Sequence, residues 1–181
     1  MKILLSGAQG TGKSTLNLEL MKHFPSFTSL DSVSAKFAKS KEDFKDEQKL
    51  KSFQTKISLY CYFLYLDTDN CISSRSLADA YAYNKFEYSK TLDTRYKGLA
   101  NLALELAKDF SKNDIVNVYI PRMFELESTN LRSGDIDFQI KIDSLIQEFY
   151  KITKLNYLTI KSDKLEKRVE EILKEVERRG L

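Results

Sequence analysis

The chain has 181 residues, of which 42% are hydrophobic and 30% are charged, a composition typical of a globular protein with a sizeable core. Its 29 basic and 26 acidic residues give a net charge of +3, which argues against a protein that coats nucleic acid. No apolar run reaches the roughly 20 residues needed to span a bilayer, and the first residues are typical of a strand rather than a signal peptide. Cys61 and Cys71 lack the spacing of metal ligands or of a disulfide framework, so we expect free buried thiols in a cytoplasmic protein with no membrane partner.

The first motif lies between a short apolar run, residues 2–6, and a stretch with helical spacing that begins at Ser14. Residues 7–14 read GAQGTGKS and match the phosphate-binding pattern G-x-x-x-x-G-K-[ST]. Glycines let such a loop turn its backbone N–H groups toward an anion, and the following helix adds the positive end of its dipole. A glycine-rich turn without a ligand is the alternative, but strand, loop and helix together favour a nucleotide site. Lys13 is expected to reach the β- and γ-phosphates and Ser14 to bind Mg²⁺; the expected donor-binding residues are Gly7, Gln9, Gly10, Thr11, Gly12, Lys13, Ser14 and Thr15.

After this loop, short apolar runs alternate with longer amphipathic stretches, which predicts a parallel sheet covered by helices. The further expected strands are residues 27–30, 70–73, 114–120 and 156–160. Two expected helices are recognised by their apolar faces. One carries Phe53, Ile57, Tyr60 and Leu64, and the other carries Leu99, Leu102, Leu106 and Phe110. Two more are recognised by their first residues: Asp135 caps one, and the capping-box-like pair Asp163 and Glu166 opens the last. Residues 122–134 are polar and lack periodicity, which predicts a loop or mobile lid.

These elements predict a single domain over residues 1–181, a three-layer α/β P-loop fold with about five parallel strands flanked by helices. Ligands of such sheets gather at the carboxyl ends of the strands. Asp31 follows the second expected strand, where a carboxylate can accept a proton from an attacking hydroxyl or hold a magnesium-bound water; a helix N-cap is its alternative role. Arg75 follows the third strand and can present a bidentate fork to a substrate phosphate, whereas the alternative is a solvated surface arginine.

An acid that holds magnesium is missing from the ends of the apolar strands at residues 72–74 and 118–120. Hydrolytic P-loop motors generally need that acid, so its absence weakens the case for a motor ATPase. We therefore expect Mg²⁺ to rest on Ser14, the nucleotide oxygens and water, with Asp31 or Asp79 acting through water.

The expected lid carries Arg122 and Arg132, and an arginine that arrives with the substrate can stabilise a transferring phosphoryl group. Arg132 is the main candidate, and the alternative is that both side chains simply solvate a loop. A basic and aromatic segment could stack a base and grip a phosphate, although core packing explains its tyrosines equally well. Its members are Tyr81, Tyr83, Lys85, Phe86, Tyr88, Arg95, Tyr96 and Lys97.

Three stretches, residues 7–14, residues 74–83 and residues 131–133 with the following helix, resemble a group of small bacterial and phage P-loop kinases. The group includes the nicotinamide riboside kinase domain of bacterial NAD regulators and phage proteins similar to deoxynucleoside monophosphate kinases. The resemblance implies a kinase-like fold with a lid, in which Arg75 contacts the acceptor or transferred phosphate, Asp79 helps to position it and Arg132 is the lid arginine. Members usually read Asp-Arg-Ser in the middle motif, whereas this chain has Ser74 in place of the acid.

The sequence therefore predicts an ATP-dependent, Mg²⁺-dependent phosphotransferase with Lys13, Asp31, Arg75 and Arg132 as catalytic residues. The expected substrate contacts come from Asp31, Arg75, Asp79, Tyr83 and Arg122. A deoxynucleoside monophosphate is the first choice of acceptor, because its phosphate oxygen is already anionic. A hydroxyl acceptor (a nucleoside, nicotinamide riboside or a polynucleotide end) is the second, and there Asp31 is needed as general base. A nucleotide-binding regulator with little turnover and a polynucleotide-binding protein stay as alternatives, and the oligomeric state, a homodimer included, is left open.

Overall fold

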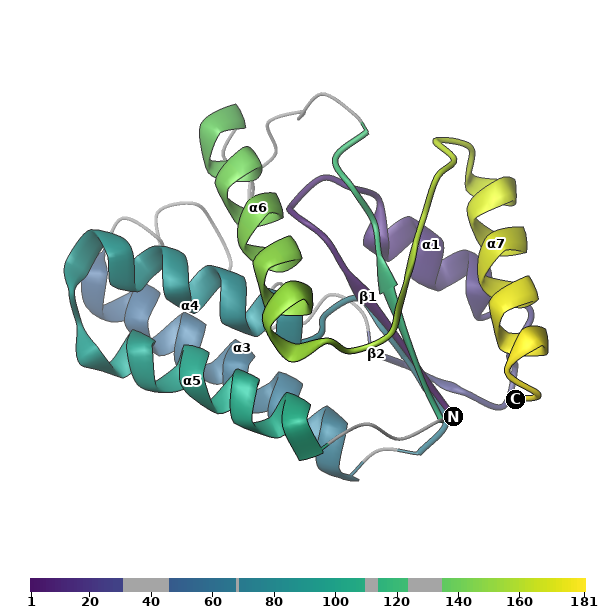
Figure 1. The fold of residues 1–181 in the computed structure, drawn as a ribbon, viewed down its shortest axis with the longest axis horizontal. Helices are drawn as coiled ribbons and strands as arrows, with labels where there is room; N and C mark the ends of the chain where they lie inside the picture. The colour runs from purple at the N-terminus through teal and green to yellow at the C-terminus, as the bar shows by residue number, and fades with distance from the viewer. Residues whose placement is uncertain (31–45, 68, 110–113, 124–134) are drawn as a thin grey trace.

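A computed structural model describes residues 1–30, 46–67, 69–109, 114–123 and 135–181 (Figure 1). Five parallel strands form one sheet in the order β2-β3-β1-β4-β5. The strands are β1 (Lys2–Ser6), β2 (Thr28–Leu30), β3 (Cys71–Ser73), β4 (Ile115–Tyr119) and β5 (Tyr157–Thr159). Each lies inside the range predicted for it, and the predicted α/β fold class is confirmed. Because the strands are parallel, their carboxyl ends share one edge of the sheet, with the central β1 between β3 and β4.

Helices cover both faces of the sheet, as Figure 1 shows. They are α1 (Lys13–Leu20), α3 (Glu47–Asp67), α4 (Leu77–Thr91), α5 (Thr94–Asp109), α6 (Ile136–Thr153) and α7 (Leu165–Arg178). Side chains alternate between the faces along a strand, so Ile3 and Leu5 pack in one apolar cluster with α1 and α7, while Leu4 packs in another with α3 to α6. All five residues of β1 are buried, as expected of a strand with helices on both faces.

Side-chain caps fix the start of two helices on the larger layer. Ser76 caps α4 in a capping box with Asp79, and Asp135 caps α6 by accepting a hydrogen bond from the Phe138 N–H at 3.0 Å, as predicted. The capping box expected for α7 is wrong, because its N-cap residue is Lys164, which makes no side-chain cap hydrogen bond. Glu171 instead accepts the backbone N–H groups of Lys161 and Ser162 ahead of that helix.

The buried stripe of α5 differs from the leucine stripe that marked this helix in the sequence. Leu102 is 40% exposed, while Ala100, Ala103 and Ala107 are buried. The three alanines pack in the core cluster together with residues of α4, whereas Leu99, Leu104 and Leu106 are only partly buried against it. The buried face therefore lies one position along from the predicted leucines. The prediction was wrong because leucine carries a stronger hydrophobic signal than alanine.

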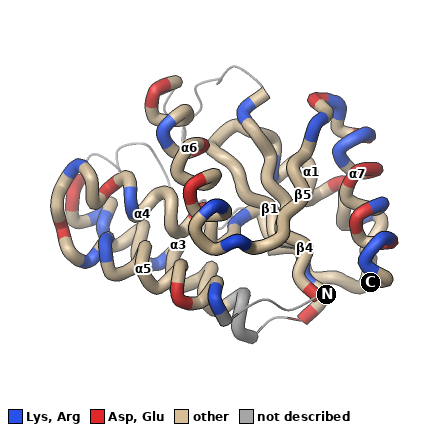
Figure 2. The backbone as a smooth tube through the Cα atoms, in the orientation of Figure 1, with Lys and Arg blue, Asp and Glu red and all other residues tan. Residues whose placement is uncertain are grey.

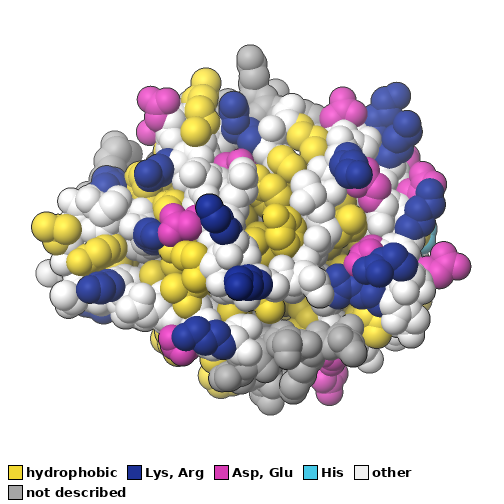
Figure 3. Space-filling model, viewed as in Figure 1, with side chains coloured by type: hydrophobic (Ala, Val, Ile, Leu, Met, Phe, Trp, Pro, Cys, Tyr) yellow, Lys and Arg dark blue, Asp and Glu magenta, His cyan; other side chains and the backbone are white. Residues whose placement is uncertain are grey.

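Charges of both signs are interspersed over the described surface. Lys and Arg alternate with Asp and Glu along α7 and over α3 to α5 (Figure 2), and the face shown in Figure 3 mixes basic, acidic and hydrophobic side chains. No described helix combines the length and the apolar character needed to cross a membrane. Cys61 and Cys71 are free and buried, as predicted, and burial raises the pKa of the Cys61 thiol to about 12.

The end of α7 is tied to the start of β4 through charged side chains. Glu175 accepts hydrogen bonds from Arg178 and Arg179, and Arg179 Nη1 donates to the Ile115 carbonyl at 2.9 Å. Arg178, and after it Arg179, lowers the pKa of Glu175 from the ordinary 4.5 to about 2. A carboxylate whose pKa is lowered in the folded state stabilises that state fully above its unfolded pKa.

We therefore expect Glu175→Gln to lower the melting temperature by about 2 °C at pH 7, with the difference from wild type vanishing as pH falls from about 4.5 to about 2. Thermal unfolding across this pH range tests it. Glu177→Gln is the matched control, since Glu177 lies on the same helix and pairs with no cation in the described part of the chain. Equal acid profiles for the two variants would contradict the assignment.

Candidate functional site

The loop of residues 7–14 joins the central strand β1 to α1, at the edge where all the strands end. Gly10 and Gly12 have φ of 80° and 87°, in the left-handed region that side-chain-bearing residues rarely adopt. Gly12 is also the N-cap residue of α1, so the first N–H groups of this helix open onto the loop. Ser14 is half-buried and Thr15 exposed in the first turn of α1. The loop therefore has the glycine conformations and the helix start that a phosphate cradle needs, and its ligand stays a prediction.

The Lys13 side chain bends back over the loop that precedes it. Its ammonium donates to the carbonyl oxygens of Gly7 and Ala8, the latter at 2.8 Å. The residue is only 8% exposed, and its Nζ lies 4.0 Å from Oδ1 of Asp79 on α4. A buried cation thus lies at the cradle.

Asp79 is the acidic centre of the site and is 1% exposed. Its Oδ2 accepts hydrogen bonds from the Ser76 N–H at 3.0 Å and the Ser76 hydroxyl at 2.8 Å. Its Oδ1 makes no hydrogen bond within the described ranges, but lies 3.8 Å from Arg75 Nη1 and 4.0 Å from Lys13 Nζ. Burial raises the pKa of Asp79, and Lys13, Arg75 and Ser76 oppose this rise. One carboxylate therefore serves two cations.

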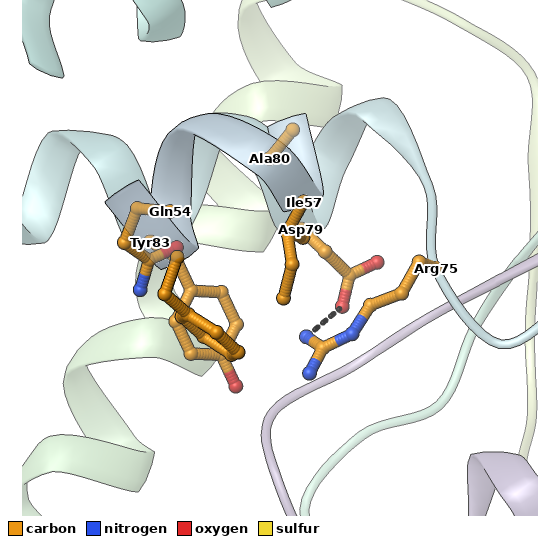
Figure 4. Close-up of a pocket in the computed structure, with 7 residues that line it drawn as sticks. Gln54, Ile57, Arg75, Asp79, Ala80 and Tyr83 are labelled. Carbon is orange, nitrogen blue, oxygen red and sulfur yellow. Dashed lines mark ion pairs between the residues drawn. The ribbon is translucent and has the colours of Figure 1, made fainter. Parts of the chain in front are cut away.

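Arg75 stands between this carboxylate and an aromatic ring, as Figure 4 shows. Its guanidinium carbon lies 5.1 Å from the centre of the Tyr83 ring, a cation–π distance. Burial alone would lower the pKa of Arg75, but Tyr83 and Asp79 outweigh it and the pKa is raised. Arg75 therefore stays charged.

A small pocket opens beside Arg75, between α3 and α4. Apolar and aromatic side chains make most of its wall, and Arg75, Asp79 and the Gln54 amide supply its polar groups (Figure 4). Its lining residues are Phe53, Gln54, Ile57, Arg75, Asp79, Ala80 and Tyr83. The pocket thus brings one cation, one carboxylate, one amide and two aromatic side chains together beside the loop.

Several buried polar atoms around the site have no hydrogen-bond partner among the described residues. They are Ser74 Oγ, Asp79 Oδ1, Tyr83 Oη and Gln139 Oε1. Asp79 Oδ1 faces Lys13 and Arg75, and Tyr83 contacts Arg75, so Ser74 Oγ and Gln139 Oε1 are the buried atoms that ordered water or a ligand would satisfy. Ser74 stands at the position where the resemblance led us to expect an acid.

The remaining predicted residues are only partly placed. Asp31 and Arg132, with most of the expected lid, lie outside the described residues. Arg122 is exposed after β4 and interacts with Asp143 of α6. Burial raises the pKa of Asp143, and Tyr119, Gln147 and Arg122 oppose this rise. No described contact joins Arg122 to the pocket, so its substrate role stays a prediction.

The basic and aromatic segment is divided between the core and local pairs. Tyr81 and Tyr96 are 2% and 1% exposed, and Lys85 pairs with Glu148 of α6. Lys90 and Lys97 lie over aromatic rings of α4, at 5.1 and 5.9 Å from the ring centres. Of this segment, Tyr83 alone lines the pocket.

A metal ion would have few protein ligands at this edge. Within the described ranges, no group of three or more His, Cys, Asp or Glu side chains is placed to hold a metal. Ser14, which is half-buried at the start of α1, is the residue expected to hold Mg²⁺, and this role stays a prediction.

Two residues of the site were not predicted from the sequence. Gln139 of α6 donates to the Gln9 carbonyl at 2.8 Å, and Arg168 of α7 donates to the Thr11 carbonyl at 2.9 Å. The sequence holds only a faint signal for them. Gln139 lies three positions before Ile142, and Arg168 lies three positions after Leu165, so each polar residue shares a helix face with an apolar one.

Gly7 is required by a close approach of two backbones. A Cβ at this position would lie 2.6 Å from the Ile120 carbonyl oxygen, at a φ of 157°. Gly98, within α5, has nothing within 4 Å of the corresponding point.

Gly7→Ala is expected to cost about 2 kcal/mol or more, because the Ile120 backbone has to move. Gly98→Ala is the matched control and should add up to about 1 kcal/mol, since alanine is the better helix former. Urea unfolding monitored by circular dichroism measures both. A Gly7→Ala variant as stable as wild type would refute the close approach.

No model of a protein family matches the chain, and no curated protein matches its sequence. Solved structures do match. Deoxyadenosine kinase from M. mycoides with bound dCTP superposes with a TM-score of 0.71 at 16% identity, covering 98% of this chain and 100% of that one. Thymidylate kinase from Candida albicans gives 0.68 at 15% identity, covering 99% and 92%. The YorR protein from Bacillus subtilis, in complex with phosphorylated GDP, gives 0.60 at 21% identity, covering 98% of each chain. The chain therefore has the P-loop fold of nucleoside and nucleotide kinases.

Proposed function

We propose that the chain is an ATP-dependent phosphotransferase of the nucleoside and nucleotide kinase type, with a deoxynucleoside monophosphate as acceptor. The observation that carries the proposal is the convergence of Lys13 and Arg75 on Asp79, next to the phosphate-binding loop. We also propose that the chain is related to the phage kinases and to the kinase domain of NAD regulators, as its motifs suggest.

The donor nucleotide would bind with its phosphates in the loop of residues 7–14. The Lys13 ammonium donates to two loop carbonyls and faces Asp79, so a rotation of its side chain could bring it to the phosphates. Mg²⁺, when bound, neutralises charge on the donor phosphates, and Ser14 is the residue that would hold it. Transfer of a phosphoryl group then depends mainly on positioning and on fixed positive charge.

The acceptor would occupy the pocket between α3 and α4, with its phosphate at Arg75. Phe53 and Tyr83 line the pocket and could pack against a base, whose edge could exchange hydrogen bonds with the Gln54 amide. The Arg75 guanidinium lies 3.8 Å from Asp79 Oδ1, the same oxygen that Lys13 faces, so the acceptor phosphate would lie near both cations.

The acidic groups favour a phosphate over a hydroxyl as the attacking group. Asp79 is the one carboxylate among the residues that line the pocket, and it already serves Ser76, Arg75 and Lys13. Ser74, which follows β3, adds a hydroxyl and no second carboxylate. A monophosphate oxygen needs no base, because it is already anionic at neutral pH.

ADP release with ATP, Mg²⁺ and a panel of deoxynucleoside monophosphates and nucleosides tests the proposal. We expect release that depends on a monophosphate and about 100-fold lower kcat for Arg75→Met, because one fixed cation facing the transferred charge is lost. Arg95→Met is the control, since the Arg95 side chain is 63% exposed and is not among the residues that line the pocket. If ATP raises the melting temperature but no acceptor stimulates ADP release, the kinase proposal fails and a nucleotide-binding regulator is favoured.

Asp31→Asn separates the two classes of acceptor. With a monophosphate acceptor, turnover should stay within about 3-fold of wild type, because no proton has to be removed by that carboxylate. Steady-state kcat with the best acceptor of the panel is the measurement. A collapse of kcat would show that a hydroxyl attacks and that Asp31 is its base.

A further inference from the structure

The backbone of the phosphate-binding loop is held from outside by two helices that lie far away in the sequence. Gln139 Nε2 of α6 donates to the Gln9 carbonyl at 2.8 Å, and Arg168 Nη1 of α7 donates to the Thr11 carbonyl at 2.9 Å. Gln139 is 1% exposed and Arg168 is 3% exposed. Both side chains are therefore fixed within the packed structure.

Arg168 joins three segments through one planar group. Besides Thr11, its Nε donates to the Ser162 carbonyl at 2.8 Å and its Nη2 contacts Met123 Sδ at 3.4 Å. Its Nη1 lies 3.2 Å from the point that a Cβ on Gly12 would occupy, so the guanidinium rests directly against the loop. A lysine has a single ammonium and cannot reproduce this fork.

The geometry of the peptide bond links these contacts to the opposite side of the loop. In a trans peptide, the carbonyl of one residue and the N–H of the next point in opposite directions. A donor that holds the Gln9 carbonyl therefore fixes the direction of the Gly10 N–H, and a donor on the Thr11 carbonyl fixes that of the Gly12 N–H. Gly10 and Gly12 have the left-handed φ values and the freest backbones in the loop, so these peptides gain most from an anchor.

We propose that Gln139 and Arg168 are positioning residues that aim the Gly10 and Gly12 N–H groups at the donor phosphates. The identity of the donor rests on the proposed function, whereas the aiming of the loop does not. When an N–H group already points toward the anion, binding avoids the entropy cost of ordering a free loop. Arg168 also places a positive charge behind the cradle, where it attracts the same anion.

The proposal is tested on the full chain with a probe that needs only the loop, inorganic tripolyphosphate, and with ATP in the absence of acceptor. We expect Arg168→Met to weaken the binding of both, measured by calorimetry, by about 10-fold, because the Gly12 N–H is no longer held in place and a positive charge beside the loop is lost. Arg168→Lys should recover part of the loss, because it keeps the charge but not the fork. In the kinase assay the KM for ATP should rise while the KM for the acceptor stays unchanged.

Two matched controls separate positioning from general stability. Arg179→Met also removes an arginine that donates to a backbone carbonyl from the end of α7, but at Ile115, at the opposite edge of the sheet. Gln147→Leu removes an amide donor from α6 that reaches Tyr119 and Asp143 instead of the loop. Both should bind tripolyphosphate as wild type does, whereas Gln139→Leu should bind it about 5-fold more weakly.

The proposal is overturned if Arg168→Met binds tripolyphosphate as tightly as Arg179→Met once both are shown to be folded by circular dichroism. This outcome is independent of the kinase proposal. Binding of tripolyphosphate that depends on Arg168, without phosphorylation of any acceptor, would leave the positioning role supported and the kinase function refuted.

Discussion

The charge on Asp79 is the constraint on which the site depends. Two cations, the buried Lys13 and the half-buried Arg75, face its Oδ1, and without this carboxylate they would repel each other with little water to screen them. Its Oδ2 is held by Ser76, which makes the same side chain the cap of α4. The start of that helix and the spacing of the two cations are therefore fixed together. The cluster carries one excess positive charge, and this excess suits a phosphate group.

The loop itself is a meeting point of all three layers. The loop directly follows β1. Two of its carbonyls accept hydrogen bonds from side chains of α6 and α7, and the Lys13 ammonium faces Asp79 of α4. No short segment of the chain contains enough of these groups to build the cradle. The sheet serves as the frame that brings each helix to a fixed distance from one turn of backbone.

The sequence predicted what local patterns encode and missed what distant contacts decide. The strands, the phosphate loop, Asp135 as a cap and Arg75 beside the loop follow from short motifs and from the ordering of parallel strands. The alanine face of α5 was missed because alanine carries little hydrophobic signal, and the cap of α7 because Glu171 binds that turn from inside the helix. Gln139 and Arg168 were missed because their partners lie 130 and 157 residues away. A single sequence offers no pattern over such separations.

The long separations within the site also govern when it forms. Ser6 in β1 bonds the Val118 carbonyl in β4, 112 residues later, and the loop gains its Arg168 contact only after α7 has docked. Closing such long segments of chain is slow, so parallel sheets of this kind fold late relative to their local helices. During synthesis on the ribosome, the loop of residues 7–14 would emerge long before α7, and would lack the Arg168 contact until that helix had docked. Capture of an anion by the finished loop would thus report that α7 had docked, and a ligand bound there would stabilise the folded domain against proteolysis.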